Sequence, residues 1–377
     1  MGLDVRMDAG SFPKAFPVEL RSESFEQDRL KELGMRMKLA VVAGVFAGLS
    51  LASLSGVAQT GYKVTAEWKV GGDGGWDYLA VDPATNELYV TRGAHVMAID
   101  TATGKVVADI AGFKGTHGVV FSNDGKTGWI SDGRSNEVAV FDRATHAVTG
   151  KVATGANPDG MVFDEFTQTV WAFNGTGKSA TVIDAKTNTA VATIPLPGKP
   201  EFPVTDGKGS IFVNIEDKNL IVHLDAVKKS KLAEWSIAPC DSPSGQAIDV
   251  KSNRLFSVCD GGVMTVTDAA TGKVVATPKI GDGPDAAWFD AKTGLIFSSN
   301  GQSGTLTIVH EDSADKYTVV DTVKTAASGR TMALDAKTGT VYVVVGKFGP
   351  RPAPTAENPR PWPTLIPGSF EVLVVSR

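Results

Sequence analysis

The sequence holds few of the residues from which metal and redox centres are usually built. Its 377 residues include two cysteines and five histidines, so a cysteine-rich zinc site and covalent c-type haem are excluded. The histidines form no close-spaced pair, and no Gly-x-Ser-x-Gly elbow, phosphate-binding loop or dinucleotide fingerprint occurs. Any catalytic or metal site must therefore gather residues that lie far apart in the chain.

An excess of positive charge is also missing. The chain carries 37 Lys and Arg against 42 Asp and Glu, a net charge of −5, whereas a protein that mainly grips nucleic acid is usually basic. A content of 42% hydrophobic and 21% charged residues excludes a disordered chain. The 41 glycines and 19 prolines indicate a large core with many turns.

Residues 35–58 have the three parts of a secretory signal peptide. A basic start at 35–38 is followed by an apolar stretch at 39–54 and by small residues that end at Ala58. The apolar stretch is shorter than the roughly 20 residues that span a bilayer, so we predict cleavage and export to the periplasm or the medium; a retained anchor is the alternative. Residues 1–34 precede this signal, so we interpret them as a misassigned start or a disordered extension, with translation beginning at Met35 or Met37.

A repeat of 40 to 45 residues fills the chain after residue 60. Each unit has an apolar strand that ends on a small polar residue, and these markers are spaced 40, 42, 42, 43, 41 and 45 residues apart. The markers are Asp82, Ser122, Asp164, Asp206, Asp249, Asp290 and Asp335. Each unit reads as four short strands, for example 78–81, 88–91, 95–99 and 105–110. This period predicts an all-β fold, a single seven-bladed β-propeller with four-stranded blades over residues 62–377.

The seventh unit lacks one strand. It offers only the runs 331–334, 341–345 and 370–375. The segment 62–70 has the pattern of the outer strands of other units, so we predict that this N-terminal strand completes the last blade. Such pairing would cover an exposed sheet edge and hold both ends of the chain.

Several strands resemble the repeats of a known family. Leu88-Tyr89-Val90-Thr91 and Thr181-Val182-Ile183-Asp184 are similar to the 40-residue YVTN β-propeller repeats of the YncE-like proteins. The resemblance covers residues 62–377, and the WD dipeptides and kelch glycine pairs of other propellers are missing. It implies an exported propeller without implying one reaction, and nucleic-acid binding has been proposed for some members of the family.

Seven equivalent positions, five residues before the markers, begin the predicted innermost strands. Because they share one repeat position, they should surround one mouth of the central channel. They are Asp77, His117, Asp159, Glu201, Ser244, Asp285 and Arg330. Carboxylates that converge in a narrow funnel repel each other and gain by binding a cation or sharing protons. We predict a site for a cation, such as a divalent metal ion, or for a polar ligand; solvated residues of a wet channel are the alternative.

Further residues are expected on the same face. The second strands of five units end there with Arg92, Asp132, Asn174, Glu216 and Asn300. The segment 347–369 leaves from this face, holds seven prolines and carries Arg351, Arg360 and Trp362. Because proline fixes φ and donates no hydrogen bond, the segment should be extended and stiff. It either covers the mouth or braces the last blade.

The two cysteines are expected at one end of a single blade. Cys240 comes just before an innermost strand, and Cys259 ends the strand predicted to pair with it. In an oxidising compartment this placement favours a disulfide. Two buried thiols are the alternative.

Three functions remain open at this stage, because propellers carry many activities. The first is a monomeric, exported binding or scaffold protein without turnover, whose partner is a small polar molecule, a cation or another protein. The second is an enzyme at the channel mouth, either a metal-assisted hydrolase or lactonase or an oxidoreductase with a bound metal or quinone. The third, nucleic-acid binding, is implied by the resemblance and opposed by the charge.

Overall fold

Short antiparallel strands make up nearly all the regular structure of residues 60–355, 361 and 363–377, the part of the chain that the computed structural model describes. Two 3-10 helices, η1 (Gly133–Ser135) and η2 (Glu216–Lys218), are the helical segments found there. None of the described residues belong to a helix with the length and hydrophobicity that a bilayer crossing demands. The predicted extension 1–34 and signal 35–58 lie outside the described residues.

Five of the six sheets have four strands each. Two of them are β9 (Pro158–Asp164), β10 (Thr169–Asn174), β11 (Ser179–Asp184) with β12 (Thr189–Pro195), and β13 (Pro200–Thr205), β14 (Ser210–Ile215), β15 (Leu220–Asp225) with β16 (Ser230–Ser236). The next two are β17 (Asp241–Asp249), β18 (Arg254–Asp260), β19 (Val263–Asp268) with β20 (Val274–Ala276), and β21 (Pro284–Asp290), β22 (Leu295–Asn300), β23 (Thr305–Ser313) with β24 (Lys316–Lys324). The fifth joins β1 (Lys63–Lys69) to β25 (Met332–Asp335), β26 (Thr340–Val345) and β27 (Glu371–Ser376).

The sixth sheet has seven strands, where the sequence predicts two separate blades. Its members are β2 (Leu79–Asp82), β3 (Glu87–Thr91), β4 (Gly93–Asp100), β5 (Val106–Phe121), β6 (Thr127–Asp132), β7 (Glu137–Asp142) and β8 (Val148–Ala153). The first part of β5 pairs with β4 and its last part pairs with β6. Thr116 pairs with both Gly93 and Asp132, so β5 belongs to both groups of strands and joins them into one sheet.

The N-terminal strand pairs as predicted. In sheet order β1-β27-β26-β25, β1 runs antiparallel to β27 with Lys63 opposite Ser376 and Lys69 opposite Glu371. The Tyr62 hydroxyl donates a hydrogen bond to the carbonyl of Gly339 at 2.8 Å. The first described strand therefore covers the edge that the last strand would otherwise expose.

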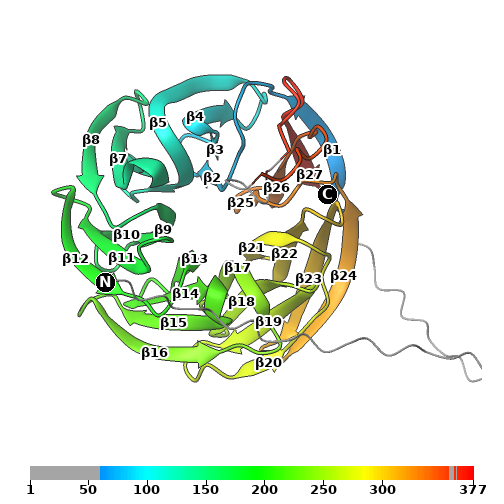
Figure 1. Ribbon diagram of the computed structural model, residues 1–377. Coiled ribbons are helices and arrows are strands. Elements are labelled where there is room, and N and C mark those ends of the chain that lie inside the picture. The colour runs from blue at the N-terminus through cyan, green and yellow to red at the C-terminus, as the bar shows by residue number, and fades with distance from the viewer. Residues whose placement is uncertain (1–59, 356–360, 362) are drawn as a thin grey trace, which may run out of the picture. The chain divides into compact units, whose positions relative to one another are not determined.

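The sheets stand around a common axis with β2, β9, β13, β17, β21 and β25 innermost (Figure 1). Their faces pack on neighbouring sheets. Trp171 and Phe173 of β10, for example, pack in one cluster with Ile211 and Val213 of β14. Because both faces of a sheet are buried, its strands read as continuous apolar runs. The core thus lies between sheets and leaves the edges of the innermost strands facing the axis.

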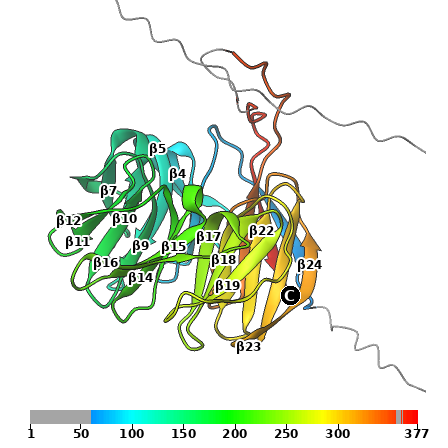
Figure 2. The same cartoon turned by 60° about the horizontal axis from the view of Figure 1, so that its bottom comes forward.

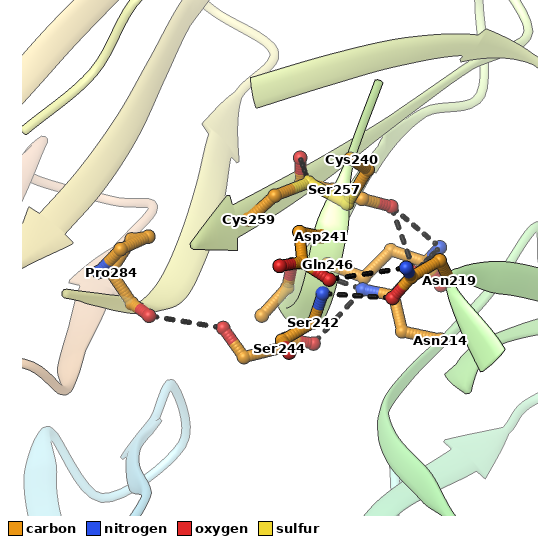
Figure 3. The surroundings of a disulfide bond; sticks show 11 residues. Asn214, Asn219, Cys240, Asp241, Ser242, Ser244, Gln246, Ser257, Cys259 and Pro284 are labelled. Atoms are coloured by element: carbon orange, nitrogen blue, oxygen red, sulfur yellow. Dashed lines mark hydrogen bonds between the residues drawn. A yellow bond between two sulfur atoms is a disulfide. The ribbon is translucent and has the colours of Figure 1, made fainter. Parts of the chain in front are cut away.

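Cys240 and Cys259 form a disulfide with a Cα to Cα distance of 5.4 Å, which confirms the predicted bridge (Figure 3). Cys240 directly precedes β17, and Cys259 lies in β18 opposite Pro243. Both sulfur atoms are buried with Ile237 and Leu255 in the cluster between two sheets. The bridge holds the start of an innermost strand to its neighbour.

Candidate functional site

A cavity of about 810 Å³ lies where the innermost strands begin. We call it the acidic mouth, because its wall holds six carboxyl groups and two basic side chains. The charged residues of the wall are Asp77, Asp159, Lys199, Glu201, Glu216, Asp260, Asp285 and Arg330. The carboxyl groups come from several sheets, so the register of the repeat has gathered them at one end of the axis.

Six of the seven predicted strand-start residues line this cavity, and the seventh, His117, contacts one of the six. The six are Asp77, Asp159, Glu201, Ser244, Asp285 and Arg330. His117 Nδ1 lies 2.7 Å from Asp77 Oδ2. The Ser244 hydroxyl donates to the carbonyl of Pro284 at 3.1 Å (Figure 3), so this residue joins two sheets.

Asp77, His117 and Asp159 form the tightest cluster of the acidic mouth. His117 Nδ1 also lies 3.6 Å from Asp159 Oδ1. Each of the three residues offers one atom that could bind a metal ion, and these three atoms lie within 4.8 Å of one another. Burial alone would lower the pKa of His117, but the hydrogen bond to Asp77 and the charges of Asp159, Asp77 and Glu201 outweigh it and raise the pKa to about 9. At neutral pH the imidazolium itself therefore sits between the two carboxylates.

A second cluster surrounds Lys199. Its ammonium lies 2.5 Å from Glu201 Oε1 and 2.5 Å from Glu216 Oε2. Burial and the neighbouring charge of Asp159 raise the pKa of Glu201 above its usual range, although Lys199 opposes the shift. Burial and the charge of Asp77 likewise raise the pKa of Asp159. Both carboxyl groups therefore resist ionisation, mainly because they are buried and also because a second carboxylate lies nearby.

Arg330 completes the charged wall. Its guanidinium forms an ion pair with Asp285 and donates to the carbonyl of Trp76 at 3.1 Å. Arg330 Nη2 also lies 3.7 Å from Asp77 Oδ1, so Arg330 contacts the cluster of Asp77, His117 and Asp159. Arg330 therefore bridges the first and last innermost strands rather than standing free.

The proline-rich segment supplies one wall of the acidic mouth. Phe348 pairs with Leu365 in an isolated bridge, and both line the cavity together with Pro363. The Phe348 ring lies 5.6 Å from that of Trp76, centroid to centroid. In Figure 2 the orange-red part of the chain before β27 stands out from the sheets on one side. The described part of 347–369 thus borders the mouth and also packs on the last sheet.

Of the two arginines and the tryptophan predicted on this segment, the structure describes Arg351. Arg351 is exposed and is not among the lining residues. Arg360 and Trp362 lie outside the described residues.

Most of the predicted second-strand ends are not on the cavity wall. Glu216 lines it, but Arg92, Asp132, Asn174 and Asn300 are fully buried. The Asn300 amide donates to Thr305 and Thr307 Oγ1 at 3.2 and 2.9 Å. Arg92 instead donates to carbonyls of the loop before β2, and Asp132 accepts from the backbone N–H of Gly115 at 2.8 Å. These side chains turn inward because they satisfy backbone and hydroxyl groups, a demand that outweighs solvation at the rim.

Sequence reasoning missed several residues of the wall. Asp260 ends β18, the strand equivalent to those that supplied Glu216 and Asn300, so the same repeat rule could have found it. Lys199 lies two residues before the predicted Glu201, and Tyr78 lies one residue after the predicted Asp77. Phe348 and Leu365 carried no repeat signal, because the segment that holds them is an insertion.

Comparison with known proteins supports the fold. No family model and no curated protein sequence matches the chain. Among solved structures, hydrazine synthase of Kuenenia stuttgartiensis is similar over 73% of this chain and 93% of its own, with 15% identity and a TM-score of 0.63. The WD40 repeats of RRP9 are similar over 81% of this chain and 96% of their own, with 11% identity and a TM-score of 0.69. U3-55K is similar over 83% of this chain and 99% of its own, with 11% identity and a TM-score of 0.70. The described chain has a β-propeller fold. At these identities the likeness shows the fold alone.

Proposed function

We propose that this protein is an exported binding protein that takes up a divalent cation in its acidic mouth. The observation that carries the proposal is the convergence of six carboxyl groups on one cavity, whose described lining has two cationic side chains, Lys199 and Arg330; His117 bonds to Asp77 of this wall. Like charges this close favour proton uptake or a bound cation. Burial, followed by the charge of a neighbouring carboxylate, raises the pKa of both Asp159 and Glu201, so their ionised forms gain from a bound cation.

The architecture behind this proposal is a seven-bladed propeller of the YVTN type. We infer seven blades because β5 can serve as the outer strand of β2-β3-β4 and as the inner strand of β6-β7-β8. The sequence repeat likewise has seven units. Export is supported by the three-part order of residues 35–58 and by the disulfide, which persists in oxidising compartments.

Asp77, His117 and Asp159 are the proposed ligands. Two carboxylate oxygens and an imidazole nitrogen suit Mn²⁺ or Zn²⁺. His117 must lose its proton to bind a metal, so protons and the cation compete for one position. Since the pKa of His117 is raised to about 9, affinity for the cation should rise as the pH increases from 6 to 9.

Isothermal titration of metal-free protein with Mn²⁺ and Zn²⁺ tests this proposal. The variant that combines Asp77→Asn with Asp159→Asn should lose binding. Asp109→Asn is the matched control, because Asp109 also contacts a histidine, His95 at 2.5 Å, but lies outside the cavity wall. Equal binding by the parent and the double variant, or no saturable binding at pH 8, would reject the proposed site.

The same donors support a second candidate, a metal-assisted hydrolase. Three protein ligands leave a coordination position for water, and a metal-bound water is a nucleophile near neutral pH. The cavity of about 810 Å³ has room for a substrate beside the cluster. Turnover of lactone or ester substrates that depends on added metal and disappears in the Asp77→Asn, Asp159→Asn variant would favour the enzyme over the binding protein.

A further inference from the structure

A second cavity, of about 390 Å³, lies along the innermost strands. We call it the channel cavity. Its wall comes from β2, β5, β9, β13, β17 and β21. Six aromatic side chains line it: Tyr78, Phe121, Phe163, Phe202, Trp288 and Phe289. None of the described residues that line it carries a charge, so this part of the channel is chemically unlike the acidic mouth.

Tyr78 and Phe202 separate the two cavities. Tyr78 borders both of them. Its ring lies 4.9 Å from that of Phe202, centroid to centroid, in an edge-to-face arrangement, and its hydroxyl donates to Glu201 Oε2 at 3.3 Å. Tyr78 comes from the segment before β2 and Phe202 from β13, an innermost strand of a different sheet (Figure 1). The two rings therefore meet across the channel.

Among the described residues that line the channel cavity, Gln246 is the one with a buried side-chain atom that lacks a hydrogen-bond partner. This side chain is 1% exposed, and its Oε1 has no partner. The orientation of its amide is fixed: Asn214 donates to the carbonyls of Ser244 and Gly245, so Asn214 Oδ1 must accept from Gln246 Nε2, at 3.0 Å (Figure 3). Gln246 lines the cavity, and its buried Oε1 is then left without a donor, which is costly.

The other polar side chains of the wall are already engaged or solvated. The Thr205 hydroxyl donates to Asp164 Oδ1 at 2.6 Å, and Trp288 Nε1 donates to the carbonyl of Met332 at 3.0 Å. Asn123 is exposed. Gln246 thus offers a ligand a hydrogen-bond acceptor without first breaking a bond within the protein.

We propose that the channel cavity binds a small, neutral aromatic alcohol, with its rings among the aromatic side chains and its hydroxyl donating to Gln246 Oε1. A cavity of this size and apolar lining is typical of small-molecule sites, and aromatic pairs contribute beyond the apolar area they bury. An uncharged wall rejects an ionised ligand, because burying an unpaired charge is costly. Water gains little there, since buried water needs two to four polar partners.

Titration with three naphthalene probes tests the proposal. 2-Naphthol should bind saturably; 2-methoxynaphthalene, which cannot donate, should bind about fivefold to tenfold more weakly; and 2-naphthoate should bind at least about a hundredfold more weakly. Gln246→Met should reduce affinity for 2-naphthol to that for the methyl ether. In this variant Asn214 Oδ1 still accepts the hydrogen bond from Ser257 Oγ at 2.8 Å, so the substitution does not leave it without a donor.

Two controls place the binding. Gln302→Met makes the same exchange in the acidic mouth and should leave 2-naphthol affinity unchanged. Asp77→Asn combined with Asp159→Asn should also leave it unchanged, so failure of the cation proposal and failure of this one are distinguishable. The proposal is overturned if 2-naphthol fails to saturate below about 1 mM, if the methyl ether or the naphthoate binds equally well, or if Gln246→Met binds like the parent.

Discussion

Arg92 offers a test of how the acidic mouth is held in place. Its guanidinium is buried and donates to the carbonyls of five consecutive residues, Gly71 to Gly75, at distances of 2.9 to 3.2 Å. It also lies 3.7 Å above the ring of Phe370. The five carbonyls belong to the loop that leads directly into Trp76 and Asp77. Replacing Arg92 by Met therefore removes the centre around which this loop is folded.

The expected cost follows from these contacts. Residues 72–75 are exposed, so their carbonyls can turn to water, and each lost bond should cost only about 0.5 kcal/mol, the low end of the usual range. Five such bonds, with a further contribution of about 0.5 to 1 kcal/mol from the stacking on Phe370, give a loss of about 3 kcal/mol in the free energy of unfolding. Arg92→Lys should recover less than half of this loss, because one ammonium has three donors and cannot match a planar guanidinium.

Urea denaturation followed by tryptophan fluorescence measures the loss. Arg134→Met is the control: Arg134 is exposed, so its replacement should change the free energy of unfolding by less than about 0.5 kcal/mol. Because the loop positions Asp77, cation affinity should also fall in Arg92→Met under conditions where the variant is folded. A variant that unfolds at the same urea concentration as the parent would refute the structural role assigned to Arg92.

Three further predictions concern the bridge, the first strand and pH. Replacing Cys240 and Cys259 together by Ser should lower the free energy of unfolding by about 3 kcal/mol, from the chain entropy of a loop with a sequence separation of 19; a loss below about 1 kcal/mol in calorimetry would contradict this. Deleting residues 60–69 should expose the edge of β27 and cause aggregation visible by light scattering, whereas a monodisperse protein that melts like the parent would argue against it. His117, whose pKa is raised to about 9, should stabilise the fold fully below its unfolded pKa of about 6.5 and lose that contribution as the pH rises through 9. The stability difference between the parent and His117→Gln should therefore shrink between pH 6 and pH 9.5, and a constant difference in urea midpoints would rule out the imidazolium contacts as its source.

The sequence repeat by itself determines much of the fold and of the site. A strand has a side-chain period of two, so innermost strands that share one register must place equivalent residues at the same end of the axis. Asp77, Asp159, Glu201, Asp285 and Arg330 accordingly line one cavity. The pairing of β1 with β27 and the disulfide followed from the same counting.

Tertiary structure decided what lies outside this periodicity. Asn300 and Arg92 stand at strand ends, where the available hydrogen-bond partners decide whether a side chain turns inward. Asn300 donates to Thr307, and Arg92 donates to the loop before β2, so neither side chain lines the mouth. The Phe348 and Leu365 wall depends on an insertion that the repeat does not describe. The contact between Tyr78 and Phe202 depends on how far apart their two sheets stand around the central axis. A local sequence pattern fixes which face of a strand a residue occupies, but contacts between distant strands depend on the packing of all the sheets around the axis.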